Sequence, residues 1–149
     1  MENITKSAID TKRLGEKTGN RIIEGDLGFK DNATVLALKG DLGTGKTTFV
    51  QGLSKVVKDN LRIVSPTFIL MRTYEGDTKN LYHIDTYRLG DNAEKEIIEL
   101  GFKDIINDPK NIVVIEWADK ISGILPKGTI WIIFESISES ERKITFKNE

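Results

Sequence analysis

The stretch Gly40-Asp41-Leu42-Gly43-Thr44-Gly45-Lys46-Thr47-Thr48 decides how the rest of the chain is interpreted. It follows the phosphate-binding pattern G-x-x-x-x-G-K-[ST]. The apolar run at 35–38 before it is typical of a buried strand. The apolar residues after it recur at the spacing of one helix face: Phe49, Val50, Leu53, Val56 and Val57. A loop that joins a strand to a helix is the setting this motif requires, so the sequence predicts a nucleotide phosphate site here.

The residue types of this loop suit a bound triphosphate. Gly40, Gly43 and Gly45 let the backbone approach a ligand, and successive N–H groups can then cradle an anion. The start of the next helix adds free N–H donors and a partial positive charge. Lys46, expected to face solvent without ligand, is predicted to reach the phosphates, and the Thr47 hydroxyl to bind Mg²⁺. The predicted nucleotide contacts are Asp41, Leu42, Gly43, Thr44, Gly45, Lys46, Thr47 and Thr48.

Length and composition limit the class of protein. A chain of 149 residues with 38% apolar and 30% charged residues is predicted to form one domain, 1–149. It has no cysteine, which excludes disulfides and thiol catalysis. No apolar run is long enough to span a membrane, and the first residues lack the apolar core of a signal peptide, so we expect a cytoplasmic protein. The 22 basic and 23 acidic residues give no broad positive surface for nucleic acid.

Two further segments have helical patterns. Ser7 begins a capping pattern with Asp10, which predicts a helix from there to about Gly19. The segment 92–107 is expected to form one helix or two short ones, with a break at Gly101. The predicted helices therefore lie on both sides of the phosphate-binding loop in the sequence.

The remaining apolar segments have strand patterns. Four consecutive aliphatic residues at 112–115 are typical of a central strand buried on both faces, and Glu116 follows them directly. Other strands are expected at 61–64, at 69–74 and 81–85 as one antiparallel hairpin, and at 129–134 and 143–146 as another.

A P-loop enzyme needs an acidic group for Mg²⁺, usually at the end of a neighbouring strand. Glu116 ends the strand at 112–115, and Asp85 ends the strand at 81–85. The carboxyl ends of such strands form the ligand crevice of an open α/β sheet. Because the strand before Glu116 is the more apolar, its carboxylate should be partly desolvated and compensated by the metal. We therefore predict that Glu116 is the closest acidic group to Mg²⁺, and that Asp85 acts one step further out, where it could orient a water.

Three more residues are candidates. Thr67 follows Pro66 in a stiffened loop and is predicted to sense the γ-phosphate, as GTPase switch threonines do. His83 shares a strand face with Asp85, where a histidine is more often structural, so its role stays open. Arg88 is either a charge-stabilising group or part of a surface ion pair.

Five motifs, taken together and in this order, resemble the TsaE (YjeE) family, the small P-loop ATPases of bacterial tRNA threonylcarbamoyladenosine synthesis. They cover roughly 35–126, and Thr44 departs from the alanine that is usual in the family. The motifs are the loop 40–48, Ser65-Pro66-Thr67-Phe68, His83-Ile84-Asp85-Thr86-Tyr87-Arg88-Leu89, Glu99-Leu100-Gly101 and Ile115-Glu116-Trp117.

The resemblance implies a P-loop NTPase-like, three-layer α/β fold with a mixed central sheet flanked by helices. It also implies a subunit that binds ATP and Mg²⁺, hydrolyses ATP and acts with the TsaB–TsaD heterodimer, in which TsaD carries out the transfer onto tRNA. On this analogy Thr47 and Glu116 bind the metal, and Lys46, Asp85 and Thr67 belong to the catalytic site. With 22 basic and 23 acidic residues, no tight binding of bare tRNA is expected.

Two other functions stay open. A small-molecule kinase would use the same loop, but such enzymes usually carry several arginines in a lid, and the arginines here are scattered singly. A nucleotide-gated binding module would bind without turnover. The sequence has no N-K-x-D guanine signature, which disfavours a GTPase.

Overall fold

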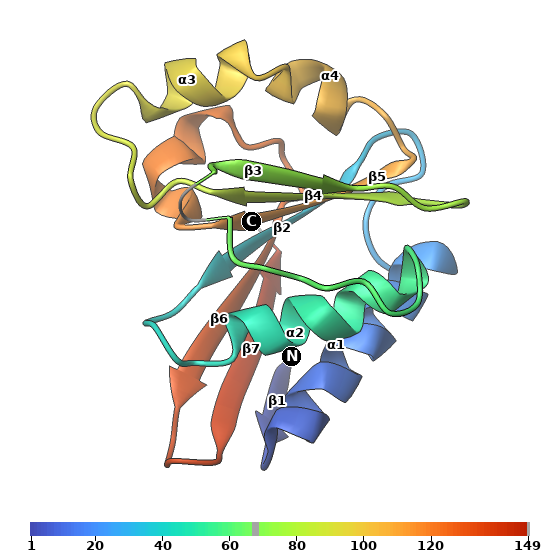
Figure 1. Ribbon diagram of the computed structural model, residues 1–149, viewed down its shortest axis with the longest axis vertical. Coiled ribbons are helices and arrows are strands. Elements are labelled where there is room, and N and C mark those ends of the chain that lie inside the picture. Colours follow the sequence, from blue (N-terminus) through green and yellow to red (C-terminus); the bar gives the residue numbers. More distant parts are fainter. Residues whose placement is uncertain (67–68, 149) are drawn as a thin grey trace.

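The computed structural model describes residues 1–66 and 69–148 (Figure 1). Within these ranges the strands form one seven-stranded sheet in the order β1-β7-β6-β2-β5-β4-β3. The strands are β1 Glu2–Thr5, β2 Thr34–Lys39, β3 Met71–Tyr74, β4 Asn80–Asp85, β5 Asn111–Glu116, β6 Ile130–Ser136 and β7 Arg142–Asn148. The central pairs β6–β2, β2–β5 and β5–β4 are parallel, whereas β1–β7, β7–β6 and β4–β3 are antiparallel. The predicted mixed sheet is confirmed.

Helices cover both faces of this sheet, which gives the three layers that the resemblance implies (Figure 1). One face carries α1 (Ala8–Ile23) and α2 (Lys46–Leu53), which continues as a 3₁₀ turn through Val56. The other face carries α3 (Ala93–Glu99), α4 (Phe102–Ile106) and the 3₁₀ helix η2 (Ala118–Ile124). In the described part of the chain, no helix is both long and apolar enough to cross a membrane.

The central strands β2 and β5 divide their side chains between two apolar layers. Leu36 and Val114 pack into the layer under α1 and α2, with Phe49 of the loop's helix. Ala37 and Ile115 pack into the layer under α3 and α4. Every residue of β5 is buried, as the aliphatic run predicted for a strand covered on both faces.

Helix α1 lies so close to α2 that glycines are required at the contact. A Cβ on Gly15 would overlap the carbonyl oxygen of Phe49, and a Cβ on Gly52 would overlap that of Lys12. The two helices therefore touch through their backbones, which fixes the first turn of α1 relative to the phosphate-binding loop.

Several predicted elements are confirmed with changed bounds. Ser7 caps α1, whose helix runs beyond the predicted end to Ile23. The segment 92–107 forms two helices, α3 and α4, and Gly101 between them has a φ of 91°. The two antiparallel hairpins are the pairs β3–β4 and β6–β7.

The strand predicted at 61–64 is wrong. Ile63 is buried in the apolar layer under α1 and α2 and Leu61 packs beside it, but the segment has no ladder partner. Val64 donates its backbone N–H to the hydroxyl of Tyr74 at 3.4 Å instead. An apolar run shows that side chains are buried, and periodicity alone does not tell a paired strand from a packed segment.

Candidate functional site

A cavity of about 540 Å³ opens where the carboxyl ends of β4 and β5 meet the phosphate-binding loop. Two groups of residues line it. We name the first the P-loop wall, consisting of residues 43 and 45–48 with Asp85 and Glu116. We name the second the α1–hairpin wall, consisting of Ser7, Thr11, Glu139, Ser140 and Arg142. The volume is that of a ligand pocket for a small organic molecule, at the sheet edge where α/β folds bind ligands.

The phosphate-binding loop is folded tightly on itself. Gly43 and Gly45 have φ values of 78° and 96°, a region that glycine enters without strain. The Thr44 hydroxyl donates to the carbonyl of Asp41 at 2.7 Å, which adds a hydrogen bond within the loop. Helix α2 begins at Lys46, directly after the turn. The strand–loop–helix setting that the motif requires is therefore present.

Lys46 is buried, which corrects the expectation that it faces solvent without ligand. It is 5% exposed, and its Nζ donates to the carbonyl oxygen of Gly40 at 2.6 Å. The same Nζ lies 5.1 Å from the centroid of the Trp117 ring, within range of a cation–π contact. A free ammonium group in a buried site costs free energy unless it is hydrogen-bonded, and the Gly40 carbonyl meets that need.

The two predicted carboxylates lie side by side. Strands β4 and β5 are parallel, and their register pairs Asp85 with Glu116 at the strand ends. Both side chains line the cavity and both residues are buried, 3% and 5% exposed. Asp85 accepts the backbone N–H of Tyr87 at 2.8 Å. The structure therefore places Asp85 and Glu116 in the same cavity as Lys46 and Thr47, and the roles of these residues toward a metal or nucleotide stay predictions.

Glu116 has two partners, and the sequence analysis did not identify its contact with His83. Its Oε2 lies 2.7 Å from Nε2 of His83, and its Oε1 lies 3.9 Å from Nζ of Lys46. The contact between His83 and Glu116 was predictable in part, because the alternation along the strand put His83 on the same face as Asp85. What the sequence did not contain was the register between β4 and β5, which sets the contact between His83 and Glu116.

The other candidates have different outcomes. Thr67 lies outside the described residues, so its predicted role stays a prediction. Arg88 takes part in an interaction, but it is not among the described residues that line the cavity. Of the predicted nucleotide contacts, Leu42, Gly43, Gly45, Lys46, Thr47 and Thr48 line it.

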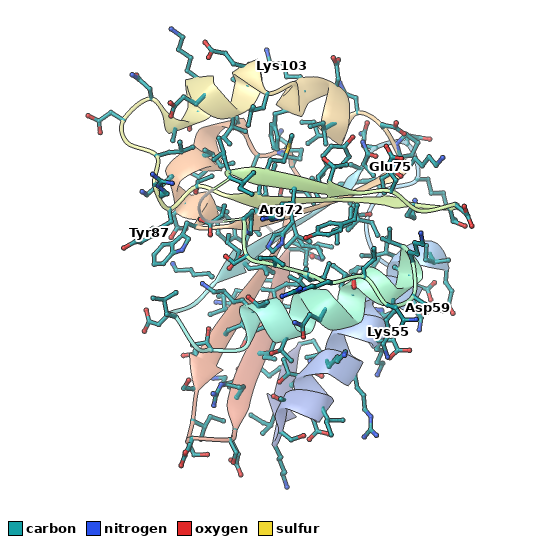
Figure 2. The ribbon with its side chains drawn as sticks, viewed as in Figure 1. Lys55, Asp59, Arg72, Glu75, Tyr87 and Lys103 are labelled. Carbon is teal, nitrogen blue, oxygen red and sulfur yellow. The ribbon has the colours of Figure 1, made fainter. Side chains whose placement is uncertain are left out.

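Aromatic residues next to the acidic groups form part of the cavity border. The rings of Tyr87 and Trp117 are 4.9 Å apart, and Figure 2 shows Tyr87 at the left of the view, where β4 ends. Trp117 has a φ of 59°, a left-handed backbone conformation that is uncommon for a bulky residue. The hydroxyl of Thr86 donates to its carbonyl and helps to hold that conformation. Backbone strain of this kind, of order 1–3 kcal/mol, concentrates at functional sites.

The α1–hairpin wall is joined to the P-loop wall through Arg142. Its Nη2 donates to the carbonyl of Gly43 at 3.1 Å, while its Nη1 donates to the carbonyls of Ser138, Glu139 and Glu141. The start of α1 and the β6–β7 turn lie together at the lower end of the view in Figure 1. The guanidinium group therefore holds the hairpin turn against the phosphate-binding loop. The sequence carried no signal for this wall beyond the Ser7 cap.

The donor set at the P-loop wall fits Mg²⁺ bound together with a phosphate. Within residues 1–66 and 69–148 there is no cluster of three or more His, Cys, Asp or Glu residues that could hold a metal. Mg²⁺ is usually held by one or two carboxylates, waters and phosphate oxygens, and does not need such a cluster. The Thr47 hydroxyl and the Glu116 carboxylate are oxygen donors of the required kind, and both line the cavity.

The chain is similar to proteins of one family over nearly its whole length. The family described as "Threonylcarbamoyl adenosine biosynthesis protein TsaE" matches residues 5–144. The tRNA threonylcarbamoyladenosine biosynthesis protein TsaE of Treponema pallidum is 33% identical over 145 residues, 97% of this chain and 98% of that protein. The protein of the same name from Haemophilus influenzae is 38% identical over 135 residues, 89% of this chain and 82% of that protein.

The likeness extends to a solved structure. The crystal structure of Bacillus subtilis YdiB matches with a TM-score of 0.76 and 28% sequence identity, over 99% of this chain and 84% of that one. The residues matched by the family, 5–144, include both walls of the cavity.

Proposed function

The chain belongs to the TsaE family, and from this premise we propose that it is the ATP-binding and ATP-hydrolysing subunit of tRNA threonylcarbamoyladenosine synthesis. One observation carries the proposal. Lys46 and Thr47, at the start of the loop's helix, line the same cavity as Asp85 and Glu116, at the ends of adjacent parallel strands. Phosphate-binding backbone, a cation and two carboxylates in one cavity are the groups that phosphoryl transfer from a nucleotide requires.

The P-loop wall would hold the triphosphate. The backbone N–H groups of the loop and the Nζ of Lys46 would bind the phosphates, with a phosphate oxygen replacing the Gly40 carbonyl as acceptor of Nζ. Thr47 and Glu116 would hold Mg²⁺, which neutralises phosphate charge when it is bound. Asp85 would orient the attacking water, and Thr67 keeps its predicted role at the γ-phosphate.

The α1–hairpin wall would hold the nucleoside. Ser7 and Thr11 line the cavity, and the Ser7 hydroxyl, which accepts the N–H of Asp10, keeps a hydrogen to donate to a ribose or base edge. Arg142 presents a planar guanidinium, which can stack on an aromatic base as well as donate hydrogen bonds. The two walls together would therefore enclose a whole nucleotide.

We further propose that turnover depends on the TsaB–TsaD heterodimer. A charge-stabilising group supplied by a partner can raise the rate of phosphoryl transfer by about 10³–10⁵-fold. Because the relatives are named for the biosynthesis of a modified tRNA, we also propose that this protein is cytoplasmic.

Phosphate release measured with and without purified TsaB–TsaD tests the proposal. We expect slow release by the isolated protein and release faster by about 10³-fold or more in the complex. Equal rates in both conditions would contradict the partner dependence. No release in either would point to a nucleotide-gated binding module, and transfer of the phosphate to a small molecule would point to a kinase.

A further inference from the structure

His83 occupies a position in β4 whose neighbours on the β5 side of the sheet are aliphatic. It is fully buried, at 0% exposure. The neighbouring positions in the same row of the sheet are Val114 on β5, Leu36 on β2 and Ile130 on β6, and all three belong to the apolar core. A polar ring in an apolar row costs free energy unless it is hydrogen-bonded. Its presence therefore calls for a partner.

That partner is Glu116. Nε2 of His83 lies 2.7 Å from Oε2 of Glu116, and both side chains are buried. Nδ1 of the ring has no hydrogen-bond partner within residues 1–66 and 69–148, and neither has Nε of Arg72, the residue paired with His83 on β3. To donate to the carboxylate, the ring must carry its hydrogen on Nε2. The contact with Glu116 is thus the polar interaction that accounts for the histidine.

The contact with His83 leaves Glu116 and Lys46 in a long ion pair without a direct hydrogen bond. Its Oε2 is engaged by His83, while its Oε1 lies 3.9 Å from Nζ of Lys46, beyond hydrogen-bonding distance. Lys46 donates to Gly40 instead. Without a donor at position 83, the carboxylate would be free to turn to the ammonium group, and a close ion pair is strongly attractive in a buried site. Such a pair would occupy the two groups that a metal–nucleotide complex needs.

We propose that His83 is a positioning residue, whose Nε2–H holds Oε2 of Glu116 and leaves Oε1 available to a cation in the nucleotide cavity. The inference rests on the proposed function, because it assigns the group that prepares the carboxylate of that same site. Groups that orient a metal ligand in this way typically change metal affinity by about 10–100-fold when they are replaced.

Two substitutions of nearly equal shape separate this role from packing. His83→Gln carries an amide nitrogen at about the place of Nε2 and keeps a donor. His83→Met fills the same space with a methyl group and has none. The measurement is the Mg²⁺-dependent gain in ATP affinity, which is the dissociation constant without Mg²⁺ divided by that with Mg²⁺. This gain is a ratio of two dissociation constants of the same variant. A substitution that weakens ATP binding equally with and without Mg²⁺ therefore leaves it unchanged.

We expect His83→Gln to keep the wild-type gain within about threefold and His83→Met to lose it by about tenfold or more. In the Glu116→Gln background, His83→Met should lower the gain no further, because the residue acts through that carboxylate. An unchanged gain in His83→Met, or equal losses in both variants, would overturn the inference. A wild-type protein with no Mg²⁺-dependent gain would overturn the proposed function first, and this inference with it.

A second measurement covers the case in which His83→Met fails to fold. His83 is the chain's one histidine, so ¹⁵N-histidine labelling gives the ring signals of a single residue. We expect a proton on Nε2, and a change in both ring signals when Mg²⁺ is added to the ATP-bound protein. A ring protonated on Nδ1 alone, or ring signals that Mg²⁺ leaves unmoved, would contradict the positioning role.

Discussion

The two walls of the cavity differ in how the chain builds them. The P-loop wall comes mainly from one short segment, residues 43 and 45–48, and its other members end two neighbouring strands. The α1–hairpin wall comes from residues 7–11 and 139–142, which lie near opposite ends of the sequence. The first wall is visible as a motif, whereas the second exists only after the chain has folded.

Packing that is unrelated to nucleotide chemistry assembles the second wall. Gly15 and Gly52 let α1 lie against α2 with the backbones in contact. The pairing of β1 with β7 ties the segment before α1 to the last hairpin, and Arg142 connects that hairpin to Gly43. A motif therefore identifies the residues of the P-loop wall, while the rest of the pocket depends on contacts that are distant in sequence.

The largest expected effect belongs to the P-loop wall. Glu116→Gln keeps the size of the side chain and removes its charge, so Mg²⁺-dependent turnover should fall by about 100-fold or more, since about 2.7 kcal/mol of metal–carboxylate interaction corresponds to that factor. Metal-free nucleotide binding should be largely retained. Asp85→Asn is the matched variant, which should slow turnover but keep the Mg²⁺-dependent gain in ATP affinity. Normal hydrolysis in Glu116→Gln, with loss of all Mg²⁺ dependence in Asp85→Asn, would reverse the two roles.

The next effect concerns the support of the α1–hairpin wall. Gly52→Ala introduces a Cβ that would overlap the Lys12 carbonyl, so the unfolding free energy should fall by about 1–3 kcal/mol. Because α1 must shift, ATP affinity should fall more than pyrophosphate affinity. Gly90→Ala is the control: a Cβ there meets open space, and stability should change by about 0.5 kcal/mol or less. Urea denaturation measures both, and equal stabilities would refute the close packing of α1 on α2.

A smaller effect is expected at the contact between the walls. Arg142→Met removes the hydrogen bond to Gly43 and the donors that hold the hairpin turn. ATP affinity should drop about fivefold, corresponding to about 1 kcal/mol for a lost hydrogen bond, while the Mg²⁺-dependent gain stays at the wild-type value. Arg13→Met changes an arginine that is 76% exposed on α1 and should alter neither quantity. Titration calorimetry decides, and a changed Mg²⁺-dependent gain in Arg142→Met would show that the two walls are not separable.

The smallest expected effect is on bare tRNA. The 22 basic and 23 acidic residues leave few clustered contacts for phosphates, so the isolated protein should show no tight binding of tRNA. Electrophoretic mobility shift at two salt concentrations measures this. Submicromolar, salt-sensitive binding would reveal a functional surface outside both walls.

The sequence predicted the features that rest on local patterns. The strand–loop–helix setting of residues 40–48, the break at Gly101 and the doubly buried strand at 112–115 are confirmed, because each depends on residues close together in the chain. The sequence also predicted that Asp85 and Glu116 end their strands, which the structure confirms, but the direct pairing of the two residues follows from the β4–β5 register.

The features that sequence analysis missed depend on register, on packing or on backbone conformation. Strand β1 is short and half polar, so it has no strand pattern of its own and is identified by its pairing with β7. The segment 61–64 is apolar because it is packed, not because it is paired. The contact of His83 with Glu116 requires the β4–β5 register, and the left-handed backbone of Trp117 has no compositional signal, since glycine or asparagine would be the expected residue there.

The central claim is that this cavity binds ATP with its phosphates on Lys46, and equilibrium titration of ATP against the wild type and Lys46→Ala tests it most directly. Lys46→Ala should keep the circular dichroism spectrum and lower ATP affinity about 100-fold, the consequence of losing a charge-assisted interaction of about 2.7 kcal/mol. A folded Lys46→Ala protein that binds ATP with wild-type affinity would contradict the account.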